Sequence, residues 1–138
     1  PPTGRLPRSW LDAYEATREV QKHLERNVRP GITSGQLYDM AVEHAAGLGY
    51  ADNFMGPTEA ASPGHRVPFV GHAVGLELDE WPPLQRGTDA TLEVGMILAI
   101  EPKMIFPGKG AIGVEDTYLL TEDGLQALTF SIREIIEA

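Results

Sequence analysis

The sequence predicts an α+β fold, in which two helices precede a set of antiparallel strands. Two observations carry this prediction. Apolar residues recur at roughly helical spacing in residues 8–28 and again from Thr33 or Ser34 to about Leu48. From residue 67 onward the pattern changes to short apolar runs separated by glycine and proline, which is typical of strands joined by turns.

The first helix is predicted over residues 8–28. Ser9 is a candidate N-cap, and the run Arg29-Pro30-Gly31 ends the helix. The second helix begins at Thr33 or Ser34, and Gly47 and Gly49 end it. The two apolar faces are formed by Leu11, Tyr14, Val20, Leu24 and Val28, and by Leu37, Met40, Ala41, His44 and Ala45.

The second part of the chain is predicted to contain the strands. Residues 50–66 have the composition of a loop. Residues 67–78 read as a strand and a turn, which Trp81-Pro82-Pro83 brings to an end. Strands of about residues 96–105 and 111–121 then form a hairpin around the turn at 107–110. A further turn at 122–124 leads into a short strand or helix at 127–136.

Composition limits the function classes. The 138 residues suffice for one domain or part of one. A net charge of −9 argues against nucleic acid as a partner. No apolar run approaches the ~20 residues that span a bilayer, so we expect no membrane, and the cytoplasm is the default compartment. The chain has no cysteine, so any metal ligand must be His, Asp, Glu or water.

Glu101 and Glu115 are the most informative local pair. If the hairpin turns around Gly108, these two residues lie directly opposite each other, with Cβ atoms ~4.5–5.5 Å apart. Two like charges at that distance repel each other, so a bridging cation or a shared proton would have to offset them. The alternative is a different register, in which one glutamate meets solvent or Lys103.

His72 is the candidate imidazole ligand, because it stands in an apolar, glycine-rich run at residues 71–76. A lone histidine in such a run is also compatible with a structural role in the core. The acidic residues that follow it, Asp79 among them, read by default as a solvated turn. His23 and His44 fall on predicted helices and are interpreted as structural or surface residues, and His65 lies in a Pro/Gly loop.

Three segments together resemble one known family. Residues 70–77 (VGHAVGLE) resemble the Gly-His-Gly-Val/Ile-Gly motif of the pita-bread metallopeptidases, a group of Xaa-Pro peptidases, methionine aminopeptidases and creatinase-like proteins. Residues 95–102 (GMILAIEP) are similar to the strand that ends in Ile-Glu-Pro, and residues 113–117 (GVEDT) to the last motif strand. Their order and spacing also match, and the Glu-Asp-Thr ending favours the Xaa-Pro branch.

The resemblance implies that residues 1–138 are the C-terminal part of a metallopeptidase catalytic domain, with helices packed on a curved antiparallel sheet. It also implies a dinuclear site with two divalent ions (Mn, Co, Zn or Fe). Three of its five ligands would be His72, Glu101 and Glu115, with Glu115 bridging and Glu101 also passing the proton of the attacking water. Two Asp ligands lie further upstream in the family, before this chain begins. The missing N-terminal Met favours a fragment.

Two positions depart from the family pattern. Asp79 stands where these peptidases usually have a second histidine, and it could bind an amine or act as a base. Gly113 stands where Xaa-Pro enzymes often have arginine. The sequence therefore predicts a peptidase that acts at peptide N-termini and is of the Xaa-Pro aminopeptidase or dipeptidase type, inactive as this chain alone.

Two other functions are compatible with the sequence. One is a non-peptide metal enzyme on the same fold, such as a lyase, and the other is an inactive binding module. The expected partners are a peptide or small-molecule substrate and either the missing N-terminal half or a second copy of the chain.

Overall fold

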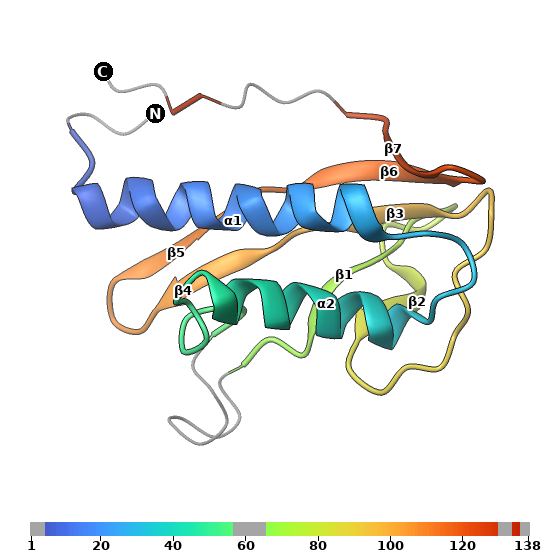
Figure 1. Ribbon diagram of the computed structural model, residues 1–138, viewed down its shortest axis with the longest axis horizontal. Coiled ribbons are helices and arrows are strands. Elements are labelled where there is room, and N and C mark those ends of the chain that lie inside the picture. Colours follow the sequence, from blue (N-terminus) through green and yellow to red (C-terminus); the bar gives the residue numbers. More distant parts are fainter. Residues whose placement is uncertain (1–4, 57–65, 130–133, 136–138) are drawn as a thin grey trace.

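The computed structural model describes residues 5–56, 66–129 and 134–135, and it has two helices lying along one face of an antiparallel sheet (Figure 1). This arrangement confirms the predicted α+β class. Within the described residues, no helix has the length and apolar character needed to cross a membrane.

The two helices begin and end close to where the sequence places them. Helix α1 covers Arg8–Asn27 and α2 covers Ser34–Gly47. The predicted cap at Ser9 is wrong, because the helix already begins at Arg8, after Pro7, and no side chain caps it. Helix α2 has a full capping box. The Thr33 hydroxyl accepts from the Gln36 N–H at 3.1 Å, and the Gln36 side chain accepts from the Thr33 N–H at 2.8 Å.

The main sheet has five antiparallel strands in the order β2-β1-β3-β6-β7. Their bounds are β1 Phe69–Ala73, β2 Glu80–Gln85, β3 Ile97–Ile100, β6 Asp116–Thr121 and β7 Gly124–Ala127. Strands β4 (Lys103–Phe106) and β5 (Gly110–Gly113) form a separate two-stranded hairpin, which extends beyond β3 and β6 (Figure 1).

The prediction that Trp81-Pro82-Pro83 stops a strand is wrong, because these residues lie inside β2. Proline lacks a backbone N–H, and in a central strand every N–H is needed by one of the two neighbouring strands. In an edge strand some N–H positions face away from the sheet, so proline is tolerated there. Strand β2 is at the edge of the sheet and pairs with β1, where Pro83 faces His72 and Glu80 faces Ala73. The register shifts between these pairs, so the β1–β2 ladder is irregular.

The predicted strand over 96–105 and its return strand over 111–121 are each divided in two. Ile100 pairs with Asp116, and Lys103 pairs with Gly113, so the register is the same on both sides of the break. It is also the register expected for a turn around Gly108. The break falls at residues 101–102 and 114–115, where Pro102 has no N–H to donate.

The core lies between the helices and the sheet. Val20 and Leu24 of α1 and Leu37 of α2 are fully buried, as are Leu98 of β3 and Tyr118 of β6. The last three of the four residues of β3 are buried, and β1 and β6 flank this strand on both sides. This packing fixes the backbone that precedes Glu101 and the neighbouring strand that carries His72.

Candidate metal centre

His72 is held in β1 between two other strands. It pairs with Ala99 of β3 on one side and with Pro83 of β2 on the other, and the residue is 9% exposed. Nδ1 lies 3.0 Å from the Ala73 carbonyl oxygen. Because a carbonyl only accepts, Nδ1 carries a proton, and Nε2 is the ring atom that a metal ion would take.

Glu101 follows β3 directly, and its backbone fixes it beside β1. Its N–H donates to the Val70 carbonyl at 2.8 Å, which continues the contact between β1 and β3 past Ile100. The side chain is 11% exposed. Its Oε1 lies 3.9 Å from His72 Nε2, and its Oε2 forms an ion pair with Lys103 Nζ. The two oxygens of one carboxylate therefore have different partners.

Glu115 lies in the break between β5 and β6, and it is exposed. Across the described ranges, no group of three or more His, Asp and Glu side chains is close enough to hold a metal ion. Glu101 contacts Lys103 and Glu115 is exposed to solvent. These contacts were expected for one glutamate in a different register, whereas the observed register is the one expected for opposed glutamates. The role of Glu115 as a ligand stays a prediction.

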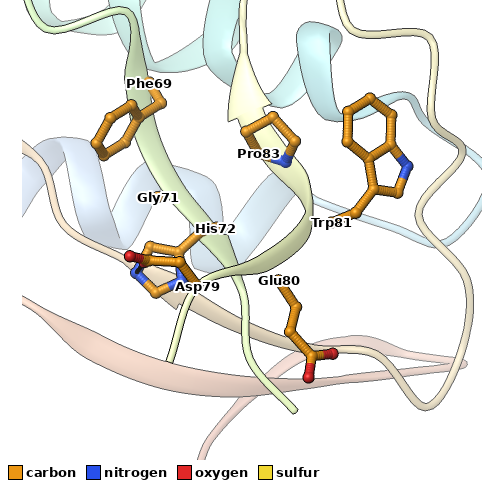
Figure 2. A pocket seen from close by; sticks show the side chains of 7 residues that line it. All are labelled: Phe69, Gly71, His72, Asp79, Glu80, Trp81 and Pro83. Atoms are coloured by element: carbon orange, nitrogen blue, oxygen red, sulfur yellow. Dashed lines mark ion pairs between the residues drawn. The ribbon is translucent and has the colours of Figure 1, made fainter. Parts of the chain in front are cut away.

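Asp79 reaches His72 from the segment between β1 and β2. Its Oδ1 lies 2.9 Å from His72 Nε2, and the Asp79 side chain is 74% exposed. Both ring nitrogens of His72 thus lie within hydrogen-bond distance of an oxygen atom. Figure 2 shows the Asp79 side chain lying across the imidazole ring. The solvated acidic turn expected at this position therefore has one member in contact with the candidate ligand.

A cavity of about 340 Å³ opens beside this pair. Its lining combines apolar side chains with the polar groups of the site, and Figure 2 shows them from close by. The residues are Phe69, Gly71, His72, Asp79, Glu80, Trp81 and Pro83. Most of them come from β1 and β2, so the irregular β1–β2 pairing shapes the cavity.

The donor atoms of His72 and Glu101 fit a transition metal. A metal bond to imidazole nitrogen or carboxylate oxygen is about 2.1 Å long. Two donors on one ion can therefore be separated by up to about twice that length, and the observed 3.9 Å lies within this range. An ion at this position needs further oxygen ligands besides Glu101.

The two other histidines in the described residues take no part in this arrangement. His23 of α1 and His44 of α2 stack on each other, with ring centroids 4.0 Å apart and planes 9° from parallel. Their interpretation as structural or surface residues agrees with this contact between the helices. His65 lies outside the described residues.

Sequence reasoning missed the apolar wall of the cavity. Trp81 and Pro83 were interpreted as the end of a strand, whereas the structure places both on β2 beside His72. The Trp-Pro-Pro run was the available signal, because prolines inside a strand indicate a sheet edge, where a cavity can open.

Comparison with known proteins identifies the family. Residues 4–122 match metallopeptidase family M24. The chain is 34% identical over 125 residues to a curated protein named Xaa-Pro dipeptidase from Pyrococcus furiosus, a match that covers 91% of this chain and 32% of that protein. This chain therefore belongs to metallopeptidase family M24.

Solved structures place it within the family. The crystal structure of the prolidase from Pyrococcus horikoshii OT3 superposes with a TM-score of 0.79 at 33% identity, covering 96% of this chain and 35% of that one. The crystal structure of methionine aminopeptidase from Thermotoga maritima superposes with a TM-score of 0.70 at 26% identity, covering 93% of this chain and 55% of that one. The predicted pita-bread fold and the likeness to the Xaa-Pro branch are confirmed. The chain spans about a third of the length of the curated relatives it matches.

Proposed function

We propose that residues 1–138 form the C-terminal part of the catalytic domain of a metallopeptidase that cleaves Xaa-Pro bonds at peptide N-termini. The observation that carries this proposal is the approach of His72 Nε2 to Glu101 Oε1, at 3.9 Å, from two neighbouring strands. The names of the relatives, Xaa-Pro dipeptidase and prolidase, support the substrate class.

His72, Glu101 and Glu115 would hold the metal from this part of the protein, and two Asp residues from the remainder would complete a site for two divalent ions. Nitrogen and oxygen donors without thiolates suit Mn, Co, Fe or catalytic Zn. When bound, the metal lowers the pKa of a water molecule and polarises the scissile carbonyl. The bond from Nδ1 to the Ala73 carbonyl keeps the His72 ring in the orientation that presents Nε2.

Glu101 is the proton-transfer group in this proposal. It accepts the proton of the attacking water on its carboxylate and passes it to the leaving amine. Burial of the side chain and the contact with Lys103 keep the carboxylate in one place for both steps. Asp79 lies on the other side of His72, where it can take a substrate amine.

An exposed apolar segment next to the cavity supports the proposal that a further protein part covers this surface. Leu76 and Leu78, in the segment between β1 and β2, are largely or fully exposed. Apolar side chains gathered in this way are typical of a surface that another protein part covers. We assign this cover to the N-terminal part of the same domain, with a second copy of the chain as the other candidate, and the whole to the cytoplasm.

The test is hydrolysis of Xaa-Pro dipeptides by the full-length protein, with and without a metal chelator. Glu101→Gln keeps the shape of the side chain and removes the proton acceptor, so turnover is expected to fall by about 10²–10⁴-fold. Chelation and Glu115→Gln are expected to abolish activity. Equal activity with and without chelator, or an active Glu115→Gln variant, would contradict the proposal.

The second candidate is a metal enzyme of this fold that carries out another reaction, such as an elimination. Asp79 motivates it, because a carboxylate on His72 can serve as a base toward a non-peptide substrate. A panel of small 2-hydroxy and 2-amino acids, assayed beside the dipeptides, separates the two functions. Robust Xaa-Pro cleavage excludes this candidate.

A further inference from the structure

The cavity beside His72 has one carboxylate that is available to a ligand. Asp79 binds His72 through Oδ1, its side chain is 74% exposed, and within the described part of the chain no partner is found for Oδ2. A carboxylate oxygen at the mouth of a cavity is an acceptor for an ammonium or guanidinium group.

Glu80 also lines the cavity, but its carboxylate is committed to the preceding turn. Glu80 Oε1 accepts from the Glu77 N–H at 3.0 Å, and the carboxylate lies over Gly75, where there is no side chain to displace it. In Figure 2 the Glu80 carboxylate points away from the rings of Phe69 and Pro83. Asp79 is therefore the group that gives the cavity its charge.

The remaining wall is apolar. Phe69 and Pro83 are half-buried, and Trp81 is 72% exposed. A wall of this kind suits the methylene stem of a long side chain whose charged end reaches water or a counter-ion. The Trp81 ring can also attract a cation that lies over its face. The apolar wall and Asp79 together fit a ligand with an aliphatic stem and a cationic end.

We propose that this cavity is a specificity subsite for a basic side chain, lysine or arginine, of the peptide substrate. The inference rests on the proposed peptidase function. We assign the ligand as a side chain and not as the α-ammonium group of the peptide, because the α-ammonium group has no methylene stem that could pack against the apolar wall. The net charge of −9 favours the approach of cationic peptides.

The test compares kcat/KM for Lys-Pro and norleucine-Pro with the full-length, metal-loaded protein. These dipeptides share the α-ammonium group and the stem length, and differ in the terminal amine. The wild-type protein is expected to prefer Lys-Pro by about 3- to 30-fold, as a partly exposed charged hydrogen bond allows. Asp79→Asn is expected to bring this ratio close to one, and Trp81→Leu to lower it by about 2- to 5-fold.

We compare the ratio of kcat/KM for Lys-Pro to kcat/KM for norleucine-Pro within each variant. A loss of activity that affects both substrates equally, such as a change in how His72 is held, cancels in this ratio. Glu77→Gln is the matched control, because it removes one negative charge from the same exposed segment outside the cavity lining. It is expected to keep the wild-type ratio. A wild-type ratio near one, an unchanged ratio in Asp79→Asn, or an equal loss in Glu77→Gln would overturn the subsite. If neither dipeptide is cleaved, the proposed function itself fails, and the subsite fails with it.

Discussion

Lys103 lies directly opposite Gly113 in the β4–β5 pair, and its side chain crosses the space above that glycine. A Cβ atom at position 113 would lie 2.6 Å from Lys103 Cγ and 2.9 Å from the Pro102 carbonyl oxygen. The absence of a side chain at 113 thus lets Lys103 reach back to Glu101. The family pattern often has arginine at the position of Gly113, and in this chain the basic side chain next to Glu101 is Lys103.

Gly113→Ala is expected to destabilise the protein by roughly 1–3 kcal/mol, because the added methyl group overlaps the Lys103 stem and the Pro102 carbonyl. Denaturant unfolding measures this change. Gly47→Ala is the control, since nothing lies within 4 Å of a Cβ at that helical position. It is expected to be neutral or to stabilise by at most about 1 kcal/mol. Equal effects of the two substitutions would show that the space above Gly113 is not filled.

Lys103→Met keeps most of the apolar stem and removes the cation from Glu101. The Glu101 side chain is 11% exposed, so its charge then lacks its partner in a largely buried position. The Lys103 side chain is 38% exposed, so solvent reduces the cost to the order of 1–3 kcal/mol. Unfolding of the metal-free protein measures it. Lys109→Met, in the exposed turn, should change stability by no more than about 0.5 kcal/mol, and a similar value for Lys103→Met would refute the pairing.

The His23–His44 stack predicts how stability depends on pH. Burial lowers the pKa of His23, and the charges of His44 and Arg26 lower it further. The unfolded state therefore binds more protons, so stability is full above the unfolded pKa of about 6.5 and falls as the pH drops below it. Unfolding free energies at several pH values between about 7.5 and 5 measure this slope. His23→Gln is expected to flatten it, and a slope that stays the same would contradict the account.

The helices could be predicted well because their signals are local. Periodic apolar residues mark α1 and α2, and the sequence around Thr33 contains its own cap. The strands were harder to place, because whether proline stops a strand depends on where that strand lies in the sheet. Pro82 and Pro83 are tolerated at the β2 edge, whereas Pro102 coincides with the break after β3.

The candidate site could be predicted only in part. The motifs singled out His72 and Glu101 as candidate ligands, and the pairing of β1 with β3 places these two residues near each other. The partners of these two residues come from side-chain conformations that spacing does not determine. Lys103 folds back over Gly113, and Asp79 turns toward His72 from an exposed segment. The register of the hairpin was predicted correctly, but the exposure of Glu115 was not, because the break in the ladder lies at that residue.

The central claim is that this chain supplies ligands to the metal site of a peptidase, and metal titration of the full-length protein tests it most directly. Calorimetry with Mn²⁺ and Zn²⁺ on the chelator-treated protein should show binding of two ions per chain. His72→Ala and Glu115→Gln should lose or greatly weaken it, whereas His23→Gln, which changes a histidine on α1, should retain it. Wild-type protein that binds no divalent ion, or undiminished binding in both His72→Ala and Glu115→Gln, would contradict the account.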